Sequence, residues 1–292
     1  MNIALFGKDF SGERTPFFKL LLESLISANA QFLMYKTYFE QVRNYLTLPE
    51  NITLFTNHSD LPITTDFIFS IGGDGTLLDT LPIVRDSGIP VLGINMGRLG
   101  FLSSVSKHEI DQAVAAIANG RYSLETRSLL LLSEPASLFP DLNYALNEVT
   151  VFRKEATSLI VIQVFVDEVF VNSYWSDGLI VATPTGSTAY SLSAGGPIIV
   201  PSAENFVITP IATHNLSVRP IVIPDKSIIR LKVVGRHTKF TLSMDSRMAI
   251  VDQSYDLVIR KAPFGLRLVQ MEGKDYFGTI REKLLWGLDI RN

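Results

Sequence analysis

The residues best suited to chemistry are three glycines around one aspartate, Gly72-Gly73-Asp74-Gly75, followed by Thr76. Glycine lacks a Cβ, so a bulky anion such as a phosphate can lie close to the backbone. A carboxylate there repels a phosphate unless it binds a cation or accepts a proton, and transfer of a phosphoryl group from a magnesium nucleotide to a hydroxyl needs both. The alternative is a tight turn with Asp74 as a helix cap, which is common for Asp-Gly pairs.

The segments on either side of this loop must position it. Phe67–Ile71 is apolar apart from Ser70, which predicts a short buried strand of a parallel sheet. Thr76–Leu81 can start a helix, and the free N–H groups of a helix N-terminus suit a phosphate. Ligands of such sheets bind beyond the carboxyl ends of the strands, which is where this loop falls.

A second polar segment follows the predicted strand 90–95. Gly97 and Gly100 flank Arg98, whose guanidinium can pair with phosphate oxygens, and Phe101 can stack on a purine. The alternative is a surface arginine beside a core phenylalanine.

Asn147 and Glu148 lie next to each other within a β pattern. Because adjacent strand residues face opposite sides, both can be solvated only if the strand bends or ends there. An amide and a carboxylate side by side suit a ribose diol, although a strand end with two exposed polar residues is an equal alternative.

The longest polar stretch runs from Asp177 to Pro197. A predicted strand leads into a loop rich in threonine, glycine and serine, and small residues then start a short helix after Thr188. Small side chains let backbone amides approach a flat ligand, and hydroxyls supply neutral hydrogen bonds. This loop therefore suits a dinucleotide better than a metal, with an ordinary turn as the alternative.

Composition restricts the classes of protein to consider. The chain has 292 residues, of which 47% are hydrophobic and 19% charged, with a net charge of −3 and no cysteine. It is therefore globular, without disulfides or thiolate metal sites, and nucleic acid is an unfavoured partner. The N-terminal sequence lacks a signal-peptide layout and no apolar run approaches about 20 residues, so we expect a cytoplasmic protein that does not bind membranes.

The order of elements predicts two domains. Strands alternate with helices over residues 1–122, which is typical of an α/β domain with a parallel sheet. Residues 123–271 are mostly short strands separated by turns, which predicts an antiparallel, sandwich-like domain. The C-terminal segment 272–292, with a helical pattern over Thr279–Leu288, is expected to pack back on the first domain.

Several other classes of site are excluded by pattern. The four histidines show no metal spacing, and no Gly-x-Ser-x-Gly elbow or Gly-Lys-Ser/Thr phosphate loop occurs. Gly7 to Gly12 does not form the glycine fingerprint of dinucleotide dehydrogenases.

Taken together, these segments resemble the NAD kinase family in order and rough spacing, from about residue 67 to Arg219-Pro220. The glycine loop alone is shared with diacylglycerol kinases and phosphofructokinases. The run Ala182-Thr183-Pro184-Thr185-Gly186-Ser187-Thr188-Ala189-Tyr190 is far more specific. The resemblance implies ATP-dependent phosphorylation of the adenosine ribose 2′-hydroxyl of NAD, with Mg²⁺ or another divalent metal mainly on the donor phosphates, in a homodimer or homotetramer.

The resemblance also implies roles for individual residues. Asp74 would be the general base, and the loop Gly72–Gly75 with Thr76 and Arg98 would hold phosphates. Asn147 and Glu148 would hold the adenosine ribose. The remaining binding residues would be Phe101, Thr188 and Tyr190 around the adenine, Asp177, Ala189 and Ser193 at the nicotinamide half, and Thr185 in the same loop.

The sequence departs from the family pattern at two places. Leu102 stands where many bacterial relatives have tyrosine, and Asp245-Ser246-Arg247 stands where relatives often have Asp-Gly-Gln. The second departure is expected to alter a hairpin turn and to place the charge of Arg247 near a phosphate. Two alternatives use the same loops: a lipid or other small-molecule kinase, and a dinucleotide sensor without enzymatic activity.

Overall fold

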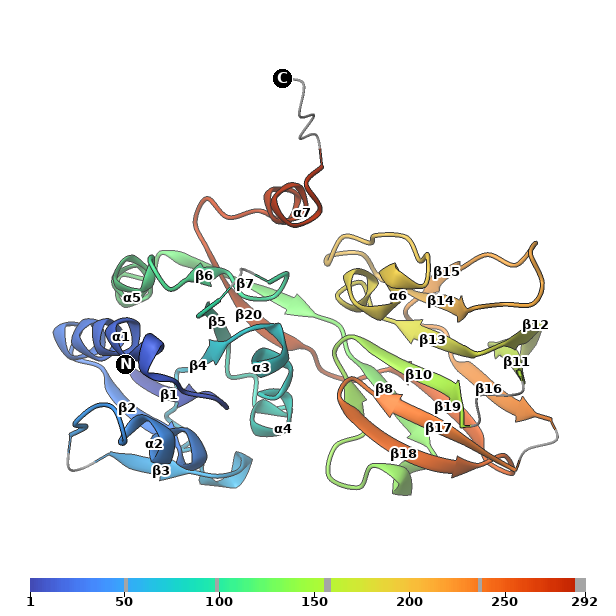
Figure 1. Ribbon diagram of the computed structural model, residues 1–292, viewed down its shortest axis with the longest axis horizontal. Coiled ribbons are helices and arrows are strands. Elements are labelled where there is room, and N and C mark those ends of the chain that lie inside the picture. The colour runs from blue at the N-terminus through green and yellow to red at the C-terminus, as the bar shows by residue number, and fades with distance from the viewer. Residues whose placement is uncertain (50–51, 98–99, 155–158, 236–237, 287–292) are drawn as a thin grey trace. The chain divides into compact units, whose positions relative to one another are not determined.

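The chain forms two compact units in a computed structural model that describes residues 1–49, 52–97, 100–154, 159–235 and 238–286 (Figure 1). By contacts between residues, the first unit comprises Met1–Thr126 with Leu266–Asn292, and the second comprises Arg127–Gly265. The first is α/β with a mostly parallel sheet and the second consists of antiparallel sheets, so the predicted fold class is confirmed.

The sheet of the first unit is built from segments far apart in the sequence. Its strand order is β3-β2-β1-β4-β5-β20-β7, with β6 paired to β5. Pairing is parallel from β3 through to β20. The strands are β1 (Asn2–Phe6), β2 (Gln31–Tyr35), β3 (Thr53–Phe55), β4 (Phe67–Gly72), β5 (Val91–Asn95), β6 (Val105–Ser106), β7 (Tyr122–Arg127) and β20 (Leu266–Met271).

The amphipathic helix α1 packs on this sheet through its apolar face. Helix α1 buries Phe18, Leu21, Leu22 and Leu25, which recur at helical spacing and pack in one cluster with the strands. The helices are α1 (Thr15–Ser27), α2 (Lys36–Val42), α3 (Asp74–Leu78), α4 (Leu81–Val84), α5 (Ile110–Ala118) and α7 (Tyr276–Leu284), with 3₁₀ turns η1 (Gly12–Arg14) and η2 (His58–Asp60).

Strand β20 belongs to a different sheet from the one that the predicted domain boundaries gave it. The sequence assigned residues up to 271 to the β-rich domain, whereas Leu266–Met271 lies between β5 and β7 in the first sheet. The reason is its parallel pairing, with Leu268 opposite Val91. A run of alternating apolar residues does not reveal which sheet it joins.

The second unit contains two six-stranded sheets, ordered β15-β14-β13-β10-β17-β18 and β12-β11-β16-β19-β8-β9. The paired strands run antiparallel. The strands are β8 (Leu130–Glu134), β9 (Tyr144–Ala145), β10 (Glu148–Arg153), β11 (Ile160–Val166), β12 (Val169–Ser176), β13 (Gly178–Ala182), β14 (Asn205–Ile211), β15 (Ile221–Pro224), β16 (Ile229–Val234), β17 (Lys239–Met244), β18 (Arg247–Asp252) and β19 (Asp256–Lys261).

The core of this unit explains the position of the polar loop after β13. Leu179 and Val181 join the large cluster that both sheets share, whereas Ile180 and Ala182 face the other way. Ile199 packs on this outer face, so the segment after β13 folds back over the sheet. That segment carries the 3₁₀ turn η4 (Gly186–Thr188) and the short helix α6 (Tyr190–Ser193); a further turn, η3 (Ala136–Leu138), follows β8.

Candidate functional site

Asp74 lies just beyond the carboxyl end of the central strand β4. It follows Gly73 and is the first residue of helix α3. Its carboxylate accepts hydrogen bonds from the backbone N–H groups of Phe101 at 2.7 Å, Leu102 at 3.2 Å and Ser103 at 3.3 Å. Three consecutive amides on one carboxylate fix its orientation. The segment that follows β5 thus holds the predicted catalytic group.

The glycines of this region are explained by close approach. A Cβ at Gly100 would lie 1.8 Å from Oδ1 of Asp74, and a Cβ at Gly72 would lie 2.2 Å from Oγ1 of Thr76. By contrast, no described atom lies within 4 Å of the Cβ position at Gly73 or Gly75. Space for a ligand therefore borders the backbone of the loop.

The second polar segment is only partly visible. Phe101 is half-buried and contributes its amide to Asp74, and Leu102 is buried. Arg98, the predicted phosphate ligand, lies outside the described residues.

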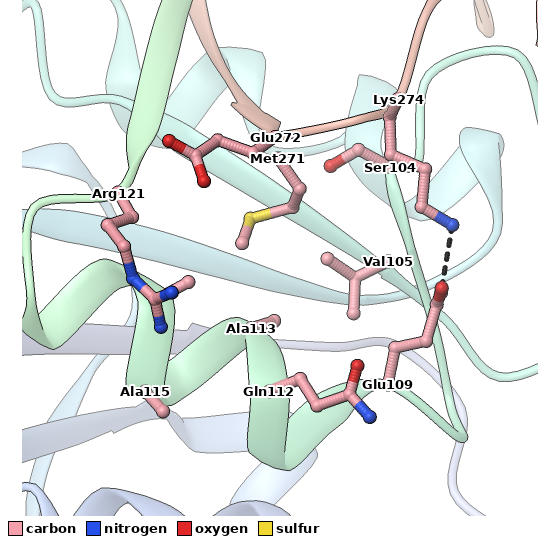
Figure 2. Close-up of a pocket in the computed structure, with 11 residues that line it drawn as sticks. Ser104, Val105, Glu109, Gln112, Ala113, Ala115, Arg121, Met271, Glu272 and Lys274 are labelled. Atoms are coloured by element: carbon pink, nitrogen blue, oxygen red, sulfur yellow. Dashed lines mark hydrogen bonds and ion pairs between the residues drawn. The ribbon is translucent and has the colours of Figure 1, made fainter.

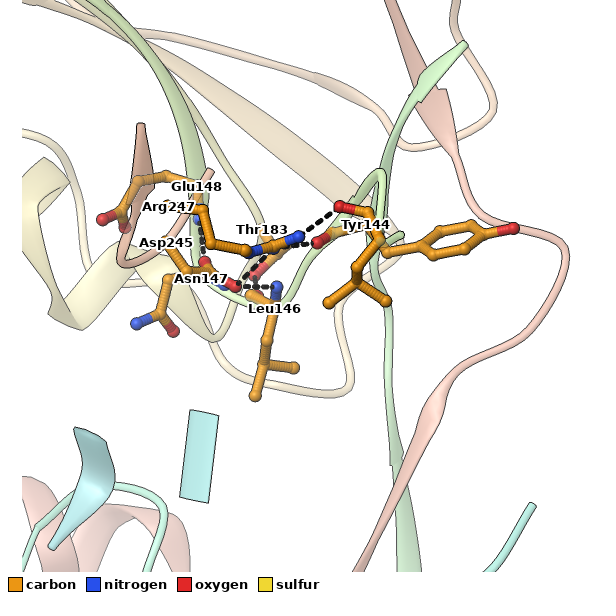
Figure 3. Close-up of polar contacts among 8 residues, drawn as sticks. Tyr144, Leu146, Asn147, Glu148, Thr183, Asp245 and Arg247 are labelled. Carbon is orange, nitrogen blue, oxygen red and sulfur yellow. Dashed lines mark hydrogen bonds and ion pairs between the residues drawn. The ribbon is translucent and has the colours of Figure 1, made fainter. Parts of the chain in front are cut away.

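In the second unit, Asn147 and Glu148 lie at the start of β10 beside a buried carboxylate that the sequence did not reveal as an anchor (Figure 3). Asp245 accepts hydrogen bonds from the backbone N–H groups of Leu146 at 2.8 Å, Asn147 at 2.8 Å and Glu148 at 3.2 Å. Its side chain is only 4% exposed. The two polar residues therefore have a fixed backbone, which directs their side chains.

The anchor comes from the turn between β17 and β18. Asp245 has a φ of 51°, in the left-handed region that aspartate tolerates better than most residues. Met244 pairs with Arg247 across this tight hairpin, at the position where the sequence predicts a hairpin turn. The one feature of the sequence that pointed to this anchor was an aspartate in a predicted hairpin turn. Its hydrogen-bond partners, about 98 residues away in the chain, could not be predicted from that feature.

Glu148 is held in a different state from an ordinary surface carboxyl. Burial, with the negative charge of Asp245 beside it, raises the pKa of Glu148 to about 8. Its Oε2 is buried without a hydrogen-bond partner among the described residues. A protonated carboxyl can both donate and accept a hydrogen bond, as a ribose hydroxyl requires of its partner.

This pKa predicts a pH dependence of stability. In the unfolded chain Glu148 loses its proton near pH 4.5, whereas in the folded protein it keeps the proton up to about pH 8. Its stabilising contribution is therefore complete below pH 4.5 and is lost as the pH rises through 8. We expect Glu148→Gln to raise the thermal midpoint relative to the parent protein at pH 8.5 but not at pH 5. An equal difference at both values would contradict this assignment.

The loop after β13 packs directly against Asn147. The N–H of Thr183 donates to the carbonyl of Asn147 at 2.9 Å, and its hydroxyl donates to the carbonyl of Leu146 at 2.6 Å. A Cβ at Gly186 would lie 2.1 Å from the same Asn147 oxygen, so only glycine allows this approach. The structure thus brings two sequence-predicted segments together within one unit.

The other predicted residues of this stretch are spread along it. Thr185 is buried, and Thr188 and Ala189 are half-buried within and just after η4. Tyr190, 42% exposed, and Ser193 lie on the following short helix α6. These side chains can line a flat ligand next to Asn147 and Glu148.

Asp177 does not join this group within one chain. It precedes β13 and pairs with Nε of Arg153 at 3.1 Å, whereas Thr183 follows the other end of the strand. Six residue steps at ~3.3 Å each separate these ends by about 20 Å. Arg153 and Asp177 thus form their own ion pair at the far end of the sheet.

A separate hollow of about 440 Å³ lies in the first unit between α5 and the end of β20 (Figure 2). Lys274 and Glu109 form an ion pair of 2.7 Å at its edge. Glu109 also accepts a hydrogen bond from the N–H of Ser106 at 3.0 Å, just before α5 begins at Ile110. Of the sequence-predicted site residues that the structure describes, none lines this hollow.

Among the described residues, no group of three or more histidine, aspartate or glutamate side chains is arranged to hold a metal ion. None of the described helices has the length and apolar character needed to cross a membrane.

Comparison with known proteins identifies the class. The model of the ATP-NAD kinase N-terminal domain matches residues 24–122, and that of the C-terminal domain matches residues 146–271. These matches mark a phosphotransferase that acts on a hydroxyl group, for which a fixed carboxylate beside a glycine loop is suited.

Full-length relatives and solved structures agree. The chain is 43% identical to an NAD kinase of Cytophaga hutchinsonii and 42% identical to one of Flavobacterium psychrophilum, with 100% of each chain covered. A yeast NADH kinase complexed with NADH superposes with a TM-score of 0.85 at 25% identity, covering 99% of this chain and 89% of the other. An NAD kinase from Archaeoglobus fulgidus in complex with ATP superposes with a TM-score of 0.75 at 26% sequence identity. The match covers 98% of this chain and 99% of the other. The chain belongs to the NAD kinase family, as the sequence motifs predicted.

Proposed function

We propose that this protein transfers the γ-phosphoryl group of ATP to the 2′-hydroxyl of the adenosine ribose of NAD, giving NADP. A bond forms between the ribose 2′-oxygen and the γ-phosphorus, and the bond from that phosphorus to the bridging oxygen breaks. ADP leaves, and the proton of the hydroxyl passes to Asp74. The family membership and the solved relatives with ATP and with NADH support this reaction.

The observation that carries the proposal is the fixed carboxylate of Asp74 beside an open glycine loop. A base must already point at the proton that it accepts, and three backbone amides supply that orientation. Gly72, Gly73, Gly75 and Thr76 would lie along the donor phosphates, and Arg98 would add a guanidinium.

For the acceptor we propose that Asn147 and Glu148 bind the adenosine ribose. Their fixed backbone and the proton on Glu148 supply both donors and acceptors for a diol. The loop after β13 would complete the site, with Phe101, Thr188 and Tyr190 at the adenine and Thr185, Ala189 and Ser193 along the dinucleotide.

We infer that the divalent metal, Mg²⁺ by preference, enters with the donor phosphates. Mg²⁺ keeps several waters and takes one or two carboxylates together with phosphate oxygens, so it needs no protein cage. It would neutralise charge that develops on the transferred group.

The position of Asp177 supports an oligomer. Asp177 lies about 20 Å along β13 from Thr183, the residue whose N–H binds the carbonyl of Asn147. A second subunit that supplies its own Asp177 would bring this carboxylate to the nicotinamide half of a dinucleotide bound at Asn147. We therefore propose a homodimer or homotetramer with shared sites. The expected cytoplasmic location stays a prediction.

The test is a coupled assay. The purified protein is incubated with ATP, Mg²⁺ and NAD, and NADP is followed through an NADP-specific dehydrogenase. A parallel arm uses NADH, because one solved relative is an NADH kinase. We expect product from NAD. A folded protein that binds NAD without forming any product would indicate a sensor, and activity on lipid vesicles alone would indicate a lipid kinase.

A further inference from the structure

Arg247 occupies a position from which it can control the site around Asn147 (Figure 3). It is the first residue of β18, and its guanidinium donates hydrogen bonds to the backbone carbonyls of Leu142 and Tyr144. Its Nη2 lies 3.9 Å from Oδ2 of Asp245, and its Cζ lies 6.0 Å from the ring centre of Phe139. One side chain thus joins the hairpin turn to the chain that leads into β10.

The contacts of Arg247 and Asp245 are consecutive along the same stretch. Arg247 holds carbonyl groups at residues 142 and 144, and Asp245 holds the N–H groups of residues 146–148. The hydroxyl of Thr183 donates a hydrogen bond to the carbonyl of Leu146. A series of hydrogen bonds therefore holds the backbone between Leu142 and Glu148.

We propose that Arg247 is a positioning residue for dinucleotide binding. It sets the direction of the Asn147 and Glu148 side chains by holding the backbone that precedes them. This inference rests on the proposed function and names a residue that acts without touching the substrate. It differs from the expectation that the charge of Arg247 lies near a phosphate, because the guanidinium is engaged with protein carbonyls.

Arginine is suited to this task in two ways. Its planar guanidinium can give separate N–H groups to two carbonyls, whereas lysine donates from a single nitrogen. Its permanent charge also favours the ionised form of Asp245, whereas burial raises the pKa of that carboxyl. The ionised carboxylate is the stronger acceptor for the three amides.

The experiment compares Arg247→Gln and Arg247→Lys with a matched control, Arg230→Gln. Arg230 lies in the other sheet, pairs with Glu168 at 2.6 Å and Asp256 at 3.5 Å, and its Cζ lies 4.3 Å from the ring centre of Phe165. Each protein is measured for its Kd for NAD by calorimetry without ATP, and for kcat and both KM values in the coupled assay.

We expect Arg247→Gln to raise the Kd and KM for NAD about 10- to 100-fold, since hydrogen bonds to charged groups are lost. The KM for ATP should stay within about twofold. Arg247→Lys should show a smaller rise because it keeps the charge but not both hydrogen bonds, and Arg230→Gln should match the parent protein.

An unchanged Kd for NAD in a folded Arg247→Gln protein, or equal losses for NAD and ATP, would overturn the proposal. If the glutamine variant does not fold, the lysine variant decides by the same criteria. Failure of the proposed function is a separate result: the parent protein would form no NADP, whatever the NAD affinity of the variants.

Discussion

Replacing Asp74 by asparagine is expected to lower kcat about 10²- to 10⁴-fold, the usual contribution of a positioned general base. Asparagine has nearly the same shape, and its single oxygen can still accept either from the N–H of Phe101 or from those of Leu102 and Ser103, which bind different oxygens of Asp74. Some of these hydrogen bonds are lost, but the fold should persist. It cannot accept the proton of the ribose hydroxyl. The loss should therefore fall on kcat, with the Kd for NAD within about threefold of the parent protein.

The matched control for this prediction is Asp79→Asn. Asp79 follows the same short helix as its C-cap residue and forms an ion pair with Lys8. The Asp79→Asn variant should retain kcat within about threefold, because an ion pair that is partly open to water, as this one is, contributes little. Gly100→Ala tests the role of Asp74 in a second way. The added Cβ would displace the Asp74 carboxylate, so this variant should also have a lower kcat. Equal activity of the Asp74 and Asp79 variants would contradict the role of Asp74.

Replacing Asp245 by alanine is expected to cause the largest loss of stability among the substitutions considered. The change removes the acceptor of three backbone N–H groups in a side-chain site that is only 4% exposed. Amides left without partners cost about 1–3 kcal/mol each, so the free energy of unfolding should fall by about 2–5 kcal/mol. Urea unfolding, followed by circular dichroism, measures this loss.

Asp252→Ala is the control for Asp245. Asp252 also accepts a backbone hydrogen bond in a turn, from the N–H of Ser254 at 3.0 Å, but this turn is exposed to water. Its free energy of unfolding should change by about 0.5 kcal/mol or less. If both variants lose the same amount, the three amides of residues 146–148 do not depend on Asp245.

The glycine loop with Asp74 was largely predictable from the sequence because its parts are adjacent in the chain. An apolar strand, three glycines and an aspartate are contiguous, and the backbone conformation follows from residue type. The same holds for the pair Asn147 and Glu148, whose adjacent polar types break a β pattern. Their assignment to particular substrate groups stays a prediction.

The contacts between distant segments were not predictable. The hydrogen bond from the N–H of Asn147 to Asp245 joins residues 98 positions apart, and neither segment contains a pattern that predicts its partner. Likewise, the pattern of β20 fits any sheet, and only pairing with β5 places it in the first unit. The far position of Asp177 follows from strand β13 running between it and the loop, which a linear reading of one polar stretch conceals.

The most direct test of the central claim follows the phosphoryl group itself. The protein is incubated with NAD, Mg²⁺ and ATP labelled at the γ-phosphate, and the product is digested to locate the label. We predict label at the 2′-position of the adenosine ribose, with little label there when Asp74→Asn replaces the parent protein. Label found only in inorganic phosphate, or on another position or acceptor, would contradict the proposed reaction.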